Sequence, residues 1–321
     1  MVRPIIIDTD PGIDDALAIM LAAASPEVEI LGITAVAGNV GLEHTSRNAA
    51  ALADLLRLDC PVGRGASGPL WRRDRNSASE VHGDNGFGGY ELPSSSRVLE
   101  PALPLLVRLI ESSAEPVTVV AIGPMTNIAL LINEYPETAR KVERFVIMGG
   151  GTQGDLGNAT PAAEFNIYYD PDAAAKMFDF GVPITMVGLN VTHRALVGRA
   201  HLSRLFASGG KLADMIGHML DTYQDSREDG GAMAQHDSLA VAAVIDPAVI
   251  ATRLLPVDVE NTGRLTSGMT VVDFRGGDGA GDTRRQSNCD VALEVDVARF
   301  RELLDTRLSA MDALLSAEDA R

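Results

Sequence analysis

The sequence has little of several features that define large protein classes. Its two cysteines, Cys60 and Cys289, are too few for a disulfide framework, and we expect both to be reduced, buried thiols. The longest apolar stretch, near residues 16–24, is far shorter than the roughly 20 residues that a membrane span needs. Positive charge is also scarce, because 27 Lys and Arg against 44 Asp and Glu give a formal net charge of −17. Such a chain is poorly suited to neutralise nucleic-acid phosphates.

Two further absences narrow the function. The first residues run directly into the apolar segment 5–7 and leave no room for a signal peptide, so we expect a cytoplasmic protein with no membrane and no nucleic-acid partner. No glycine-rich phosphate-binding loop, of either the dinucleotide or the P-loop spacing, follows that segment. A nucleotide cofactor is therefore disfavoured, whereas a neutral metabolite or a cation fits an acidic chain.

The sequence alternates short apolar runs with segments of helical spacing. Runs that are apolar on both faces are typical of a buried parallel sheet, and they occupy residues 5–7, 30–36, 117–122, 145–148 and 184–187. Helical patterns lie between them at residues 14–24, 43–58, 124–133 and 170–180. Further strands are expected at residues 249–260, 268–274 and 291–295, and a closing helix at residues 299–315.

This alternation predicts an α/β fold with a mostly parallel, Rossmann-like central sheet flanked by helices. No linker rich in serine, glycine or proline divides the 321 residues, so we expect a single domain that spans residues 1–321. The active site is expected at the carboxyl ends of the strands, where open parallel sheets bind their ligands.

Four carboxylates fall within eight residues after the first apolar run, namely Asp8, Asp10, Asp14 and Asp15. Carboxylates this close repel one another unless a cation, protons or hydrogen bonds offset their charge. Hard oxygen ligands favour Ca²⁺ or Mg²⁺ over zinc. Capping of a helix would explain Asp14 and Asp15 alone, but it does not explain four acids. The cluster therefore predicts a divalent-cation site.

Other strand-to-helix turns offer additional oxygen atoms. Asp237, which follows His236, opens an apolar helix-like run, although an Asp there is by itself more often a helix N-cap than a ligand. A main-chain carbonyl at the start of residues 122–127 could point at the same cation. Amides and a carboxylate at strand ends suit hydrogen bonds to sugar hydroxyls, although each alone is more often a turn residue. These residues are Asn39, Asn158, Glu164 and Asn166.

Three long segments lack a regular pattern, namely residues 65–96, 149–166 and 275–288. Loops of this length in a compact domain are usually functional or disordered. The first contains His82, and the second contains Asn158 and Glu164. The third has no apolar anchor and is expected to be a solvated surface loop. The position of His193, after residues 184–187, leaves its role open.

The run from Asp8 to Ala16 resembles the signature of the inosine-uridine-preferring nucleoside hydrolases, which are ribohydrolases that split N-glycosidic bonds. Other segments resemble family segments in the same order along almost the whole chain. They lie at residues 37–40, 82–83, 123–127, 148–151, 163–166, 187–189, 236–237 and 268–273. Several motifs in order are far more specific than any one of them.

The resemblance implies a set of metal ligands and a set of substrate contacts. The ligands of the implied Ca²⁺ are Asp10, Asp15, Asp237 and the main-chain oxygen of Ile122. The residues assigned to the ribonucleoside are Asp14, Asn39, His82, Met148, Asn158, Glu164, Phe165, Asn166 and Tyr223. Asp8 is expected to support the site structurally. A homodimer or homotetramer is also implied.

The implied reaction is hydrolysis of a ribonucleoside to ribose and free nucleobase, in purine or pyrimidine salvage, through an oxocarbenium-like transition state. Asp10 would activate water at the metal, and His236 would protonate the leaving base. An ordinary histidine pKa of about 6.5 suits that second task. The chain departs from some relatives in a longer segment at residues 152–156, in Ser238 where proline is common, and in residues 227–231, which lack an aromatic. These departures concern nucleobase preference.

Two other hypotheses stay open. Asp8 and Asp10 reproduce the Asp-x-Asp spacing of haloacid-dehalogenase-like phosphohydrolases, but Gly12 stands where that family has Thr or Val. A catalytically silent protein that binds calcium or nucleosides could keep the same fold, because a fold does not establish turnover. The intact Asp10 argues against this second alternative.

Overall fold

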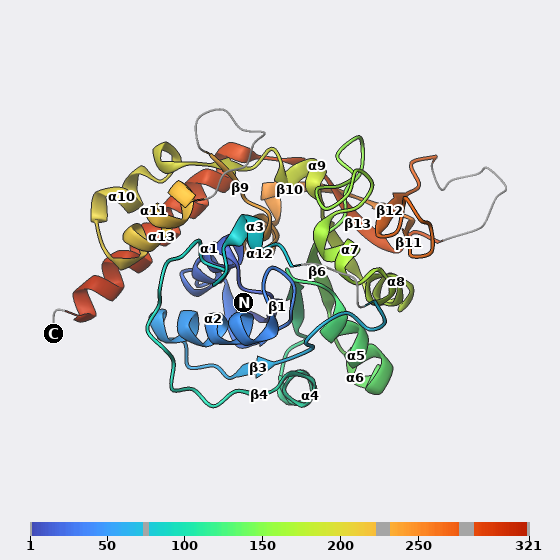
Figure 1. Ribbon diagram of the computed structural model, residues 1–321, viewed down its shortest axis with the longest axis horizontal. Helices are drawn as coiled ribbons and strands as arrows, with labels where there is room; N and C mark the ends of the chain where they lie inside the picture. Colours follow the sequence, from blue (N-terminus) through green and yellow to red (C-terminus); the bar gives the residue numbers. More distant parts are fainter. Residues whose placement is uncertain (1, 73–76, 223–231, 276–285, 320–321) are drawn as a thin grey trace.

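A nine-stranded sheet forms the centre of the computed structural model, which describes residues 2–72, 77–222, 232–275 and 286–319 (Figure 1). Its strands are β1 (Arg3–Thr9), β2 (Val28–Ala35), β3 (Val62–Arg64), β4 (Glu100–Pro101), β5 (Thr118–Ala121), β6 (Arg144–Met148), β7 (Ile184–Val187), β10 (Ile250–Leu255) and β13 (Cys289–Val295). Their order in space is β10-β13-β7-β6-β5-β1-β2-β3-β4. Every neighbouring pair is parallel except β10 and β13, which are antiparallel at one edge.

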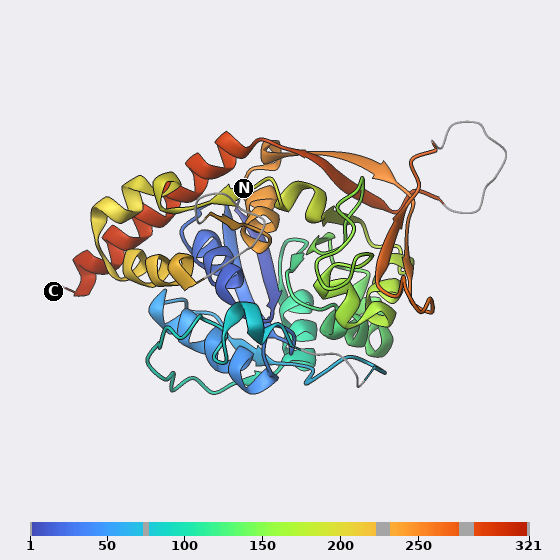
Figure 2. The same cartoon turned by 45° about the horizontal axis from the view of Figure 1, so that its top comes forward.

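Two small antiparallel sheets are separate from the central one. They pair β8 (Leu196–Val197) with β9 (Met233–Ala234), and β11 (Val257–Glu260) with β12 (Met269–Val272). Figure 2 shows the long pair β10 and β13 leading toward the β11–β12 sheet. The central sheet therefore carries a small β-extension at its antiparallel edge.

Helices cover both faces of the central sheet. They are α1 (Ile13–Ala23), α2 (Leu42–Leu55), α3 (Ser79–His82), α4 (Ala102–Ser112), α5 (Thr126–Glu134), α6 (Pro136–Ala139), α7 (Phe165–Tyr169), α8 (Pro171–Asp179), α9 (Leu189–Thr192), α10 (Ser203–Ser208), α11 (Lys211–Thr222), α12 (Asp237–Ile245) and α13 (Val297–Asp319), with 3₁₀ turns η1 (Arg199–His201) and η2 (Pro247–Val249). Side chains alternate between the faces of a strand. Ile5 and Ile7 of β1 accordingly share a core with α1, α2, α12 and α13, whereas Ile6 packs into a second core with α4, α5 and α8.

The predicted α/β architecture is confirmed, and the five apolar runs correspond to β1, β2, β5, β6 and β7. One prediction was wrong in detail, because residues 249–260 form two strands rather than one. Pro256 separates β10 from β11, and the two strands pair in different sheets. Proline cannot donate a hydrogen bond to a sheet ladder, so it marks the point where the chain changes partners.

The predicted irregular segments have different outcomes. Residues 149–164 contain no helix or named strand, and α7 begins at Phe165. The segment 65–96 includes the short helix α3, which ends at His82. Most of the predicted surface loop at 275–288 lies outside the described residues.

The buried position of α12 explains why its sequence is almost entirely apolar. All nine of its residues are buried, and it packs against α1. Among the residues that the structure describes, no helix is both long enough and apolar enough to cross a membrane.

Candidate active site

The turn between β1 and α1 presents the first part of the site. Gly12 is the N-cap of α1, so Asp14 and Asp15 lie in the first turn of that helix, where backbone amides and the helix dipole favour negative charge. Asp15 is held firmly, because it accepts hydrogen bonds from the Gly12 amide at 2.9 Å and from Asn39 Nδ2 at 3.0 Å. The hydroxyl of Thr9 donates to the same carboxylate. The sequence motif therefore fixes both the cap and the direction of Asp15.

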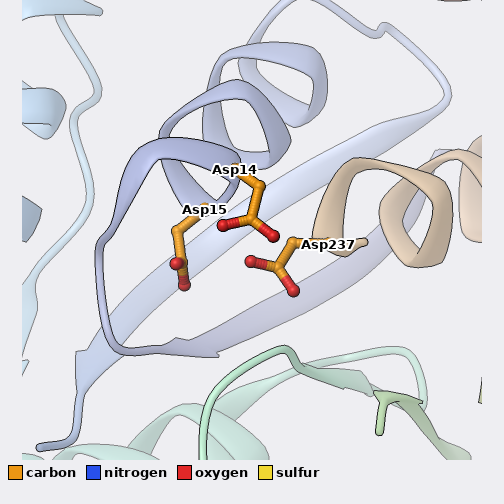
Figure 3. Close-up of side chains that lie close together, drawn as sticks. All are labelled: Asp14, Asp15 and Asp237. Atoms are coloured by element: carbon orange, nitrogen blue, oxygen red, sulfur yellow. The ribbon is translucent and has the colours of Figure 1, made fainter. Parts of the chain in front are cut away.

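A third acid from a distant part of the chain completes a buried cluster. Asp237 is the first residue of α12, and the packing of α12 against α1 brings it to Asp14 and Asp15. Each of the three offers a carboxylate oxygen, and these oxygens lie within 4.8 Å of one another. Figure 3 shows the three side chains gathered between the two helix starts, with Asp14 and Asp237 facing each other and Asp15 beside them. The arrangement could hold a metal ion.

The electrostatics of this cluster are unfavourable without a counter-charge. Burial, and then repulsion from Asp15, raise the pKa of Asp14 to about 7. Burial raises the pKa of Asp15 as well, although its hydrogen bonds oppose that shift. The pKa of Asp237 is raised well above its ordinary value by burial and by the three neighbouring acids, Asp14 foremost. A bound divalent cation reverses such shifts, because it stabilises the charged carboxylates.

Asp10 lies directly after β1 and is almost fully buried. A Cβ placed on Gly38 would lie 2.1 Å from Oδ2 of Asp10, and one on Gly123 would lie 2.7 Å from Oδ1, so these glycines admit the carboxylate. Oδ2 accepts a hydrogen bond from the Asn39 amide at 2.7 Å. Oδ1 is buried with no hydrogen-bond partner among the described residues. Burial and repulsion from Asp15 raise the pKa of Asp10 well above its ordinary value.

The unpartnered Oδ1 of Asp10 is the observation that bears on whether a metal ion fits this site. A buried carboxylate oxygen without a donor costs free energy, and native proteins normally pair such atoms. The carboxylates of Asp14, Asp15 and Asp237 converge nearby, and none of them forms an ion pair with a cationic side chain among the described residues. An all-oxygen donor set of this kind fits a hard divalent cation.

Asp8 supports the site from within β1. It is fully buried, and Oδ1 accepts hydrogen bonds from Thr34 on β2 and from Asn127 Nδ2 at 2.8 Å. Burial raises its pKa to about 7, against the effect of these bonds. The main-chain oxygen of Asp8 accepts from the amide of Ile122 at 2.8 Å. Asp8 thus ties β1 to β2 and to the start of α5.

The predicted carbonyl ligand and the predicted sugar-binding amide lie together. The main-chain oxygen of Ile122 accepts a hydrogen bond from Asn166 Nδ2 at 2.9 Å. The same amide group donates to the main-chain oxygen of Met148 at 3.1 Å. Asn166 therefore bridges the ends of β5 and β6, which are neighbours in the sheet.

Glu164 acts as the N-cap of α7. Its carboxylate accepts hydrogen bonds from the amides of Asn166 at 2.9 Å, Gly150 at 2.9 Å and Ile167 at 3.2 Å. Burial raises its pKa to about 7 in spite of these donors. It is buried, whereas the predicted sugar-binding residue Asn158 is exposed and accepts a hydrogen bond from the Phe165 amide at 2.9 Å.

His82 reaches the same turn from α3. Its Nδ1 accepts a hydrogen bond from the Ile13 amide at 3.1 Å, which is one of the unpaired donors at the start of α1. Burial lowers the pKa of His82 to about 4. The ring is therefore neutral near pH 7, and its proton lies on Nε2. Tyr223, the other residue expected near a nucleobase, lies outside the described residues.

His236, the N-cap of α12, lies in a polar group that the sequence did not reveal. Its Nδ1 is 2.8 Å from the hydroxyl of Thr192. The ring of His193 packs edge-on against it, with centroids 5.6 Å apart, and Nδ1 of His193 is 3.2 Å from Oδ1 of Asp155. His193 is the C-cap of α9, which follows β7, and this position near a strand end was the only sequence signal for its place in the site. No such signal marked Asp155 or Thr192 in the sequence.

Comparison with known proteins decides the family. The model of the family described as inosine-uridine preferring nucleoside hydrolase matches residues 5–302. The chain belongs to this family. It is 43% identical to the pyrimidine-specific ribonucleoside hydrolase RihA of Salmonella typhimurium, over 96% of this chain and 99% of that protein.

Solved structures of nucleoside hydrolases share the fold. A purine-preferring ribonucleoside hydrolase from Gardnerella vaginalis matches with a TM-score of 0.87 and 34% identity, over 97% of this chain and 100% of that one. A plant nucleoside hydrolase, PpNRh1, matches with a TM-score of 0.88 and 32% identity over the same shares. This nucleoside hydrolase is accordingly an enzyme that hydrolyses the N-glycosyl bond of ribonucleosides.

Proposed function

We propose that this nucleoside hydrolase depends on calcium and works where Asp10, Asp14, Asp15 and Asp237 meet. The observation that carries this proposal is the buried, unpartnered Oδ1 of Asp10 beside three converging carboxylates. The products are ribose and a free nucleobase, which suits a role in purine or pyrimidine salvage. We also propose a single cytoplasmic domain that assembles as a homodimer or homotetramer.

The proposed ligands of Ca²⁺ are Asp10, Asp15, Asp237 and the main-chain oxygen of Ile122. When bound, the ion would lower the pKa of water and fix the ribose hydroxyls. Ca²⁺ takes more oxygens than this set supplies, which leaves positions for the substrate. Asp14 has an oxygen close to those of Asp15 and Asp237, and we propose that Asp14 binds a ribose hydroxyl next to the metal site.

The reaction needs two proton transfers, one from the attacking water and one to the leaving base, and we assign them to Asp10 and His236. Asp10 accepts a proton from the water that attacks the anomeric carbon. His236 donates a proton to the leaving base. Because its Nδ1 is engaged with Thr192, we assign the transfer to Nε2.

The remaining contacts orient the substrate. Asn39 follows β2, whereas Asn166 lies at the start of α7 and bonds the main-chain oxygens at the ends of β5 and β6, next to the N-cap Glu164. These three residues are assigned to the ribose. Asn158, Met148, Phe165 and Tyr223 are assigned to the substrate as well. The neutral His82 has its proton on Nε2, so it can donate a hydrogen bond to a carbonyl of the nucleobase.

The experiment is a ribose-release assay with uridine, cytidine, inosine and adenosine. The protein is treated with a chelator and then given Ca²⁺, Mg²⁺ or Zn²⁺. We expect activity that is lost with the chelator and restored best by Ca²⁺. Activity that survives complete metal removal would contradict the metal role, and phosphate release from p-nitrophenyl phosphate without any ribose release would favour a phosphohydrolase.

A further inference from the structure

A tight hairpin presents Asp155 to His193 at the rim of the site. Thr152 and Asp155 form an antiparallel bridge, and the two residues between them, Gln153 and Gly154, have φ of 55° and 102°. Two successive positive φ values are typical of the tight turns that join antiparallel strands. Thr270 holds the start of the hairpin in place. Its hydroxyl accepts a hydrogen bond from the amide of Gly151 at 2.9 Å and donates one to the carbonyl of Gly151 at 2.8 Å.

The same loop holds the helix that carries His193. The main-chain oxygen of Gly150 accepts a hydrogen bond from the Leu189 amide at 2.9 Å, at the start of α9. His193 caps the other end of α9. Its side chain is 15% exposed, against 45% for Asp155, so the contact between Nδ1 and Oδ1 lies at the rim of the buried region. Both partners are thus placed by main-chain hydrogen bonds.

The ring of His236 is confined on two sides by consecutive residues of this segment. Thr192 is buried and contacts Nδ1 at 2.8 Å. His193 packs against the ring at an angle of 72°. A side chain that must deliver a proton in one direction gains from such restraint, because misorientation lowers the fraction of productive complexes.

We propose that Asp155 and His193 form a positioning pair that fixes the ring of His236 for proton donation to the leaving base. This inference rests on the proposed function, in which His236 is the general acid. Asp155 orients the ring of His193, and that ring in turn limits the rotation of His236. Among the described residues, neither side chain of the pair hydrogen-bonds to a proposed metal ligand or to a residue assigned to the ribose, so the pair acts on one step of the reaction.

The test compares leaving groups that need a proton with leaving groups that do not. Uridine and inosine lose bases that require protonation, whereas p-nitrophenyl riboside and nicotinamide riboside release stable leaving groups unaided. His193→Ala is expected to lower kcat for the nucleosides by roughly tenfold or more, with KM nearly unchanged and the two other ribosides within about twofold of wild type. His193→Gln replaces it if the alanine variant unfolds, and Asp155→Asn should show a smaller loss of the same selectivity.

Matched controls come from α2, where His44→Gln and Asp54→Asn remove a histidine and an ion-paired acid away from the site. Both should keep wild-type rates on all four substrates. Equal losses on both classes of substrate in the His193 variants, or unchanged nucleoside rates, would overturn the positioning pair alone. A wild-type protein that releases ribose from no nucleoside would instead overturn the proposed function and this inference with it.

Discussion

Two groups of buried carboxylates in this molecule have opposite surroundings. Asp305 and Asp312 are buried residues of α13, the helix that packs against α10 and α11 (Figure 1). Asp312 accepts hydrogen bonds from the amides of Leu212 at 2.8 Å and Gly210 at 2.9 Å and from the hydroxyl of Ser208. Asp305 accepts from the amides of Arg204 and Leu205, both at 3.1 Å. These acids accept hydrogen bonds from backbone amides near the starts of α10 and α11 that would otherwise lack an acceptor.

The cluster at the end of β1 lacks this balance. Asp10, Asp14, Asp15 and Asp237 are buried beside one another, and burial raises the pKa of each. Oδ1 of Asp10 has no donor among the described residues. Burial alone therefore does not mark a functional acid. The distinguishing feature is crowding without enough donors, which a ligand can relieve.

The largest effect is expected from Asp10→Asn. Asparagine keeps the shape and the acceptor for the Asn39 amide but cannot take a proton, so kcat should fall by roughly 10²- to 10⁴-fold. Ribose release measures the rate, and thermal unfolding should show a melting temperature no lower than that of wild type. An Asn variant with more than about a tenth of the wild-type rate would contradict the base role.

A buried histidine of the site gives a pH-dependent effect. The folded-state pKa of His82 is about 4, below its unfolded value of 6.5, so the unfolded chain binds a proton first as the pH falls. Stability from this residue is present above pH 6.5 and is lost between pH 6.5 and 4, by up to about 3 kcal/mol.

Urea unfolding of wild type and His82→Gln at several pH values measures this effect. The acids of the cluster contribute an opposite slope in both proteins, so the difference between the two curves isolates His82. His44→Gln serves as the control and should follow the wild-type curve. A His82→Gln variant with the same pH slope as wild type would show that the ring is not buried neutral.

Calcium should separate the two groups of acids directly. A ligand that binds only the folded state raises the free energy of unfolding by about 2.7 kcal/mol at 100 times its dissociation constant. We expect this gain in wild type and in Asp312→Asn, and a much smaller gain in Asp237→Asn. Denaturant unfolding with and without Ca²⁺ provides the measurement, and an undiminished gain in Asp237→Asn would place the ion elsewhere.

The smallest effect is expected from Asp312→Ala. Loss of this carboxylate leaves the amides of Gly210 and Leu212 without their acceptor, which should cost about 2 kcal/mol of unfolding free energy. The rate of ribose release should not change, because α13 contributes no residue to the proposed site. An Asp312→Ala variant with normal stability but reduced kcat would contradict the view that the acids of α13 are structural and those after β1 are functional.

The sequence predicted much of this molecule from local signals. Apolar runs marked β1, β2, β5, β6 and β7, because strands buried on both faces leave a continuous pattern. The motif around Asp10 to Asp15 located the acid cluster, since strand ends and helix starts have their own residue preferences. Asp237 does lie beside the cluster, but its position alone favoured a helix cap; its role as a ligand came from the family resemblance and stays a prediction.

Other features depended on contacts that no local pattern records. Thr192 and Asp155 meet His236 and His193 only because the loop after β6 folds back on α9. The split at Pro256 depends on which strands are available as partners on either side. The acceptor role of His82 Nδ1 requires the start of α1, far away in the chain.

The packing of α12 against α1 also has a kinetic consequence. Asp15 and Asp237 lie far apart in the chain and meet only when α12 packs against α1. A cation that needs both acids stabilises the finished structure but not the partly folded chain, so it should slow unfolding without accelerating folding. Departure of the ion would then set how long the folded enzyme survives.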